Sequence, residues 1–247
     1  MPETLLRLMT YNVHGCVGTD RRLDETRIAE VIAFYAPDVV ALQELDAARS
    51  RSLLTDQARH IADHLKMDFH FHPALCIEEE QYGDAILSRL PMRLIKTGIL
   101  PTSVSRWAFE PRGALLVALE VGGREVHLIN THLGLSFRER KAQIEALLSP
   151  EWMDPTISDQ RFILCGDFNA LPGSLVYKGA AERLRDVQRA LPSQKSRATF
   201  SSMYPVLRVD HIFVTADFKV TRVEVPRTPL IRLASDHLPI IVDLQLP

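Results

Sequence analysis

Apolar residues follow two spacings along this chain, one typical of strands and one typical of a helix face. Leu5–Val13 is rich in strand-forming residues and is followed by Gly15, which predicts a strand that ends there. Asp38–Leu42 is a second apolar run of strand length. Between them, apolar residues recur with the i, i+3, i+4, i+7 spacing of a helix, at Ile28, Val31, Ile32 and Tyr35. Strand, helix and strand in this order predict a crossover unit.

The same two spacings recur downstream, with strands in the majority. Turn signals divide the middle of the chain at Tyr82-Gly83-Asp84, at Pro91 and at the hairpin-like pair Gly122-Gly123. The further predicted strands are Met67–Leu75, Ala85–Ser88, Met92–Leu100, Ala114–Val121, Glu125–Asn130, Phe162–Cys165, Val209–Val214, Lys219–Val225 and Leu238–Leu246. The further predicted helices are Ala58–Leu65, Ser136–Leu148, Ser174–Tyr177 and Glu182–Ala190.

This order of elements predicts one domain of the α/β class that spans residues 1–247. No internal repeat and no linker-like segment of low complexity divides the sequence. Many strands with few helices between them predict two packed sheets with helices outside. The hairpin-like pairs predict mixed or mostly antiparallel strand pairing.

Composition and charge limit the class of protein. Hydrophobic residues at 46% and charged residues at 24% are ordinary for a globular protein. The net charge of -2 lacks the basic surplus that proteins gripping long nucleic acid usually carry. Cys16, Cys76 and Cys165 are far apart, so no disulfide framework or structural zinc site is predicted. Without a signal-peptide pattern or a run of about 18 apolar residues, the expected compartment is the reducing cytoplasm.

Polar, ligand-like residues stand at the edges of the predicted strands. In FILCGDFNALP, an apolar run ends at Gly166, and Asp167 and Asn169 follow directly. Taken alone, this pattern also describes a simple turn after a strand. The same pattern recurs elsewhere, at Asn12, His14, Glu44, Asn130, His132, Asp210, His211, Asp236 and His237. This recurrence favours a ligand site, since ligands commonly bind at strand ends in layered α/β proteins.

The chemistry of these side chains favours metal-assisted attack on phosphorus. Carboxylate and carboxamide oxygens suit Mg²⁺ or Mn²⁺. A zinc site would call for a motif such as H-E-x-x-H, which is absent, so zinc ranks second. A metal, a carboxylate base and an imidazolium together can neutralise a phosphoryl group and activate water.

The ordered motifs of the chain resemble those of the endonuclease/exonuclease/phosphatase superfamily from Thr10 to about Ile240. They are TYNVHG, LQELD, YGDAILSR, PRGALL, INTHL, CGDFNA, RVDHIFV and SDHLPI. That superfamily includes pancreatic-type deoxyribonucleases, abasic-site endonucleases, neutral sphingomyelinases and inositol polyphosphate 5-phosphatases. The resemblance implies a four-layered α/β sandwich, with two packed mixed β-sheets flanked by helices.

The resemblance also implies roles for individual residues. Glu44 matches the principal metal ligand, Asn12 the other early metal-site position, and Asp236 a further ligand or a neighbour of one. The implied metal is Mg²⁺ or Mn²⁺, seated on Glu44 with Asp167 free of it.

For the catalytic group, Asp167 matches the residue that orients or activates water, and Asn169 the one that holds the phosphate or that water. His237 matches the imidazole that contacts a phosphoryl oxygen, and Asp210 the carboxylate that keeps its ring charged. His132 occupies a position near the phosphate. Two further phosphate-contact candidates are Arg112 and His14, whereas His211 is expected to be structural.

The implied activity is hydrolysis of a phosphodiester by in-line attack of water, by a monomer. NVHG and the unit 27–44 resemble most a bacterial branch of metal-dependent hydrolases, for some of which a relation to phospholipid metabolism is suggested. A phospholipid or small-molecule head group is therefore the favoured substrate. Two alternatives stay open: a DNA endonuclease or abasic-site nuclease, which the acidic balance disfavours, and a non-catalytic binding protein, which predicts loss of site residues that this sequence retains.

Overall fold

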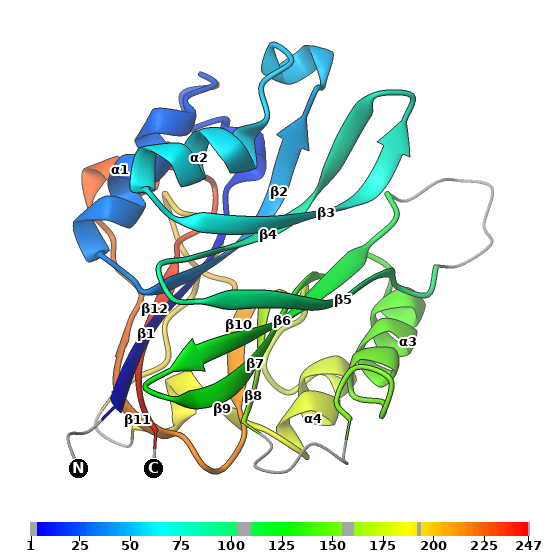
Figure 1. Cartoon of the computed structure of the whole chain (residues 1–247), viewed down its shortest axis with the longest axis vertical. Coiled ribbons are helices and arrows are strands. Elements are labelled where there is room, and N and C mark those ends of the chain that lie inside the picture. Colours follow the sequence, from blue (N-terminus) through cyan, green and yellow to red (C-terminus); the bar gives the residue numbers. More distant parts are fainter. Residues whose placement is uncertain (1–3, 103–109, 155–160, 192–193, 247) are drawn as a thin grey trace.

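Two packed β-sheets form the centre of the protein in the computed structural model, which describes residues 4–102, 110–154, 161–191 and 194–246 (Figure 1). The strand order is β11-β12-β1-β2-β4-β3 in the first sheet and β5-β6-β7-β8-β10-β9 in the second. The first sheet contains β1 (Thr4–Asn12), β2 (Val39–Ala47), β3 (Asp68–Ile77), β4 (Glu80–Ser88), β11 (Lys219–Glu224) and β12 (Ile240–Leu246). The second contains β5 (Met92–Ile99), β6 (Gly113–Val121), β7 (Arg124–His132), β8 (Phe162–Asp167), β9 (Arg185–Asp186) and β10 (Asp210–Val214).

Both sheets are mixed, which confirms the predicted fold class. β1 pairs in parallel with β2, and β7 pairs in parallel with β8. The other strand pairs are antiparallel. The two parallel pairs matter for function, because the ends of β1 and β2 in one sheet and of β7 and β8 in the other carry most of the candidate site residues.

Helices lie outside the sheets and complete a four-layered sandwich. α1 (Glu25–Tyr35) contacts α2 (Gln57–Leu65) on one side of the molecule, and α3 (Phe137–Leu147) contacts α4 (Leu175–Ala181) on the other (Figure 1). α5 (Pro229–Ala234) packs against α1. Three short 3-10 turns are η1 (His14–Cys16), η2 (Ser50–Ser52) and η3 (Val187–Arg189). In the part of the chain that the structure describes, every helix falls short of the length and apolar character that a membrane crossing needs.

The predicted apolar faces are buried in two clusters. One joins both sheets to α1 and α2, with Leu42, Leu115 and Ile32 among its members. The other joins the second sheet to α3 and α4 and includes Ile144 and Val176. Burial of such side chains supplies most of the free energy that favours folding.

Two sequence-based expectations about local structure are wrong. Tyr82-Gly83-Asp84 is not a turn but lies inside β4, where it pairs with β2 on one side and β3 on the other. The chain turns earlier, where Glu78 has a positive φ of 54°. Hydrogen bonding to two neighbouring strands outweighs the weak turn preference of one Gly-Asp pair.

The helix predicted over Glu182–Ala190 is also absent. The chain forms the short strand β9 and the 3-10 turn η3 instead. Asp186, buried between them, accepts two hydrogen bonds from the guanidinium of Arg208. A tertiary ion pair therefore decides the local conformation here. The short helix α5 was not predicted, although Thr228 before Pro229 is a helix-start signal that the structure uses.

Candidate active site

The end of β8 lies at the meeting point of the two sheets, and its conformation depends on glycine. Gly166 has a φ of 136°, a value that side-chain-bearing residues rarely adopt. A Cβ atom on Gly166 would lie 1.8 Å from the carbonyl oxygen of Thr131 on β7. The absence of a side chain thus allows β8 to run close to β7 and sets Asp167 directly beside His132, its register partner.

A bulge in β2 turns Glu44 toward the same region. The pairing of β2 with β4 shifts register between Leu42 and Leu45, and Glu44 between them has a φ of 63°. Bulges re-aim a side chain that would otherwise alternate with its neighbours. The sequence correctly associated Glu44 with this strand, but it gave no sign that the strand continues to Ala47.

Asp167 is a carboxylate that four of the other candidates contact. Its Oδ2 atom accepts a hydrogen bond from Asn12 Nδ2 at 3.0 Å. The Nε2 atoms of His132 and His237 lie 3.6 Å and 3.7 Å from the same oxygen. Its Oδ1 atom accepts the backbone N–H of Asn169 at 2.8 Å. Burial, together with the nearby charge of Asp210, raises the pKa of Asp167 to about 7.

His237 is held as a cation by Asp210. Its Nδ1 atom lies 2.9 Å from Asp210 Oδ2. Burial alone lowers the pKa of His237, but the charge and hydrogen bond of Asp210 outweigh it and raise that pKa to about 10. The imidazolium therefore presents Nε2–H toward Asp167 at neutral pH.

Glu44, His14 and Asp236 form the more open side of the site. Asn12 Nδ2 donates to Glu44 Oε1 at 2.9 Å, and His14 Nδ1 lies 3.5 Å from Glu44 Oε2. His14 Nδ1 also lies 3.8 Å from Asp236 Oδ1. Burial would raise the pKa of Glu44, but the hydrogen bonds from His14 and Asn12 keep it below its ordinary value. Glu44 is thus an anion across the physiological pH range.

The amide group of Asn12 faces the carboxylates with its nitrogen. Its oxygen accepts the backbone N–H of His14 at 3.0 Å, while its nitrogen bridges Glu44 and Asp167. In this geometry Asn12 holds the two carboxylates together. Direct metal binding through its oxygen, as the sequence led us to expect, would compete with the His14 contact.

His132 is neutral and connects the site to a buried arginine. Arg112 Nη1 lies 3.2 Å from His132 Nδ1, and Asn169 Nδ2 lies 3.1 Å from His132 Nε2. Burial and the adjacent charge of Arg112 lower the pKa of His132 to about 3. Because Arg112 can only donate, His132 Nδ1 is the acceptor of that contact, and the Asn169 amide nitrogen faces the other ring nitrogen as a second donor. Arg112 is itself buried, so it contacts the site through His132.

The donor set fits a hard divalent cation. Ligand atoms of Glu44, His132 and Asp167 lie within 4.8 Å of one another, as do those of Asp167, Asp210 and His237. His237 is protonated and paired with Asp210, which leaves the first group, with Asp236 nearby, as the more suitable one. Carboxylate oxygens predominate there, as Mg²⁺ and Mn²⁺ prefer.

A cavity of about 420 Å³ opens beside this cluster. His237 and Asn169 line the end that meets the cluster, and the remaining wall is mostly apolar. The other lining residues are Leu135, Arg140, Ala170, Leu171, Ser174, Phe200, Leu207 and Val209. The site can therefore accept a polar group at the carboxylate cluster and an apolar group next to it.

All ten predicted site residues thus gather at one end of the sheets, although His132 lies between Arg112 and the rest of the site. Sequence reasoning missed Ser235, whose Oγ donates to the Asn12 carbonyl at 2.8 Å and accepts the His237 backbone N–H at 3.2 Å. A Ser two residues before the His is a turn-forming signal that could have revealed it. Sequence reasoning also missed Arg140, which lies on the cavity wall.

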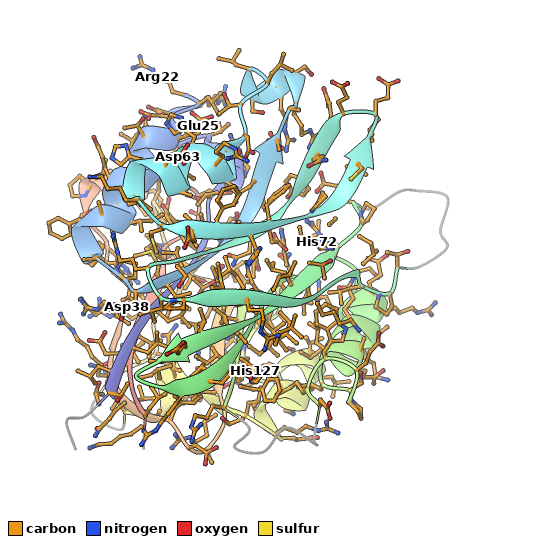
Figure 2. All side chains as sticks on the ribbon, viewed as in Figure 1. Arg22, Glu25, Asp38, Asp63, His72 and His127 are labelled. Carbon is orange, nitrogen blue, oxygen red and sulfur yellow. The ribbon has the colours of Figure 1, made fainter. Side chains whose placement is uncertain are left out.

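Other histidines lie outside the cluster. His211 is fully buried, and its Nε2 atom contacts the Ala170 carbonyl oxygen at 2.8 Å. His127, labelled in Figure 2, stacks on Phe162 near the opposite end of β7 from His132. Both have packing roles in the structure, which agrees with the expectation for His211.

Comparison with known proteins is consistent with this geometry. Residues 9–237 match the model of the family described as the Endonuclease/Exonuclease/phosphatase family. Protein YbhP of Escherichia coli is 27% identical, over 97% of this chain and 96% of its own length. A putative neutral sphingomyelinase of Drosophila melanogaster is 27% identical, over 70% of this chain and 41% of that protein. A solved endonuclease/exonuclease/phosphatase structure from Beutenbergia cavernae has a TM-score of 0.81 at 27% identity, covering 98% of this chain and 72% of that one.

Proposed function

The chain belongs to the Endonuclease/Exonuclease/phosphatase family, and from this premise we propose that it is a divalent-metal-dependent phosphodiesterase. The observation that carries the proposal is the grouping of His132, His237 and Glu44 around the buried carboxylate of Asp167: the two imidazoles lie 3.6 Å and 3.7 Å from it, and Glu44 shares with it the amide nitrogen of Asn12. An anion, a neutral imidazole and an imidazolium around one carboxylate are groups that can bind and cleave a phosphoester.

Of the group Glu44, His132 and Asp167, we propose that Glu44 would hold the metal together with the nearby Asp236, and that Asp167 stays free of it as the base. Mg²⁺ or Mn²⁺, when bound there, would neutralise part of the negative charge of the phosphoryl group. Asn12 keeps Glu44 at a fixed distance from Asp167, because its amide nitrogen donates to both. We propose this holding role for Asn12 in place of direct coordination.

The proposed reaction is in-line attack of water on phosphorus: a new P–O bond forms as the opposite bond from phosphorus to an ester oxygen breaks, and the leaving alkoxide takes a proton from solvent to depart as an alcohol. Asp167, in its ionised form, accepts a proton from the attacking water. His237, charged because of Asp210, donates a hydrogen bond to a phosphoryl oxygen and stabilises the negative charge that develops there. Asn169 and His132 lie beside Asp167 and orient the phosphate, while Arg112 holds the His132 ring through Nδ1.

A lipid head group is the substrate we favour. The apolar wall of the cavity next to His237 suits a substrate that joins a phosphate to an apolar part. The relative named as a putative neutral sphingomyelinase supports the same class. A DNA nuclease remains the second candidate on family grounds, but the net charge of -2 gives it no support.

The direct test is hydrolysis of bis-p-nitrophenyl phosphate with Mg²⁺, with Mn²⁺ and with excess chelator. We expect turnover with either metal and none with chelator. The monoester p-nitrophenyl phosphate, assayed in parallel, separates a phosphodiesterase from a phosphatase. Activity that survives the chelator, or no activity with any metal, contradicts the proposal. The second result would favour a binding protein on the same scaffold.

A further inference from the structure

Exposed apolar side chains lie on the chain segments that form the wall of the cavity beside His237. We call them the apolar rim: Leu135, Phe137, Leu171, Leu175, Tyr204 and Val206. They come from three separate segments, residues 133–141, 170–178 and 199–207, and each segment also contributes to the cavity wall. Tyr204 and Val206 are each 78% exposed, although both are large apolar residues. Exposed apolar side chains gathered in the segments that form one cavity are typical of an interaction surface.

The segment that carries Tyr204 and Val206 is firmly attached to the site. Its two arms pair through reciprocal backbone hydrogen bonds between Phe200 and Leu207, at 2.9 Å and 2.7 Å. The backbone N–H of Ser202 donates to the Asp236 carbonyl at 2.6 Å. The Phe200 ring also lies 4.9 Å from the His237 ring. The two exposed side chains are thus held out into solvent at a fixed place relative to the catalytic group.

The charges next to the rim are positive. In the three segments the exposed or half-exposed charged side chains are Arg138, Arg140, Lys141 and Lys178, of which Lys141 is paired with Glu145 at 3.2 Å, so Arg138, Arg140 and Lys178 carry the argument. Glu139 is the acidic residue of these segments, and it is buried. Arg140 lines the cavity itself. Although the whole chain is slightly acidic, this face combines apolar tips with cations, which complements an anionic lipid surface.

We propose that the apolar rim docks onto a phospholipid bilayer, so that the cavity opens toward lipid head groups. A bilayer places substrate at the mouth of the cavity, whereas a protein seated on the rim would cover it. A DNA duplex would meet apolar side chains where it presents phosphates. The inference rests on the proposed phosphodiesterase activity and adds that the substrate is taken from a membrane surface.

Vesicle flotation with the full-length protein in Mg²⁺ tests this proposal. The vesicles are equimolar phosphatidylcholine and phosphatidylglycerol, with pure phosphatidylcholine in parallel. We expect the wild-type protein to float with the anionic vesicles and less with the neutral ones. The Y204S/V206S double variant should lose at least about tenfold in binding, because two apolar contacts are replaced by hydroxyls.

The matched control is Phe34→Ser, which removes an equally exposed apolar residue. Phe34 is 77% exposed and lies near the end of α1. The carbonyl of its neighbour Tyr35 accepts a hydrogen bond from Arg7 in β1, whereas the candidate site lies at the Asn12 end of that strand. This variant should bind vesicles like the wild type. Hydrolysis of bis-p-nitrophenyl phosphate should be unchanged in both variants, and this assay keeps the test of docking separate from that of catalysis.

Three outcomes overturn the docking proposal even when the soluble diester is hydrolysed. One is no binding of the wild type to either vesicle. Another is equal binding by the wild type and the double variant. The third is a wild-type dimer in solution that the double variant dissociates, without any vesicle binding. Absence of bis-p-nitrophenyl phosphate hydrolysis, by contrast, counts against the proposed function.

Discussion

Asp167 combines two demands that conflict for a buried residue. A general base must be ionised, yet burial and the neighbouring Asp210 raise its pKa to about 7. The protein offsets this cost with the Asn12 amide, the Asn169 backbone N–H and the nearby cation His237. A carboxylate poised near neutrality is suited to proton transfer, because its two protonation states are close in free energy.

Replacing Asp167 by Asn should therefore separate activity from stability. We expect kcat for bis-p-nitrophenyl phosphate to fall by roughly 10²- to 10⁴-fold, since the proton acceptor is lost. Because the folded protein penalises the ionised carboxyl, the free energy of unfolding at pH 8 should not decrease. Urea unfolding monitored by circular dichroism checks the second part. A variant that loses activity only because it unfolds would contradict the assigned role.

The two pKa values predict the pH dependence of catalysis. The ionised Asp167 gains activity as pH rises through about 7, and the protonated His237 loses it as pH rises through about 10. A plot of kcat/KM against pH should thus be bell-shaped, with an acidic limb near pH 7 and an alkaline limb near pH 10. Because Asp167 and His237 interact, the two apparent pKa values belong to the pair. The Asp210→Asn variant removes the negative charge that raises the pKa of His237, so the alkaline limb should move to lower pH. An unmoved limb would show that His237 is not the titrating group.

At the scale of elements, the close contact of β7 with β8 fixes the spacing of His132 and Asp167. Gly166→Ala should destabilise the protein by about 2 kcal/mol or more, because φ is positive there and the new Cβ meets the Thr131 carbonyl. The midpoint of urea unfolding measures this. Gly179→Ala is the matched control: it lies in α4 with open space around its Cβ position, so it should stabilise by about 0.5–1 kcal/mol. Equal midpoints for the two variants would refute the argument.

The elements also separate what sequence could predict from what it could not. Strands such as Phe162–Cys165 were predictable because their burial produces a continuous apolar run. The bulge at Glu44 and the strand through Tyr82-Gly83-Asp84 were not, because they depend on hydrogen bonds to strands that are distant in sequence. The same holds for η3, where a tertiary pair with Arg208 replaces the expected helix.

For the site, residue types and strand ends could be read from the motifs, but orientations could not. The direction of the Asn12 amide depends on the backbone of His14, and the place of Arg112 behind His132 depends on packing. Arg140 joins the cavity because α3 contacts α4, and the residues that precede α4 line the same cavity. Such three-dimensional details determine which group faces the substrate, and they have no signature in the spacing of residues.

At the scale of the whole molecule, the site exists only where both sheets meet. Asn12 and Glu44 come from the first sheet, and His132, Asp167 and Asp210 from the second. Between the sheets, Gln43 Nε2 donates to Asn130 Oδ1 at 2.7 Å, one residue from Glu44 and two from His132. A ligand that contacts residues of both sheets at this edge therefore binds the folded protein and not the unfolded chain.

Metal binding should consequently stabilise the whole fold. A ligand held only by the native state adds RT ln(1 + [L]/Kd), about 2.7 kcal/mol at a hundredfold excess over Kd. We expect Mg²⁺ or Mn²⁺ to raise the midpoint of thermal unfolding, and Glu44→Gln to abolish the rise because it removes an anionic ligand. Asp63→Asn is the control, since Asp63 is an exposed carboxylate on α2 (Figure 2). A shift that persists in Glu44→Gln, or disappears in Asp63→Asn, would place the cation elsewhere on the surface.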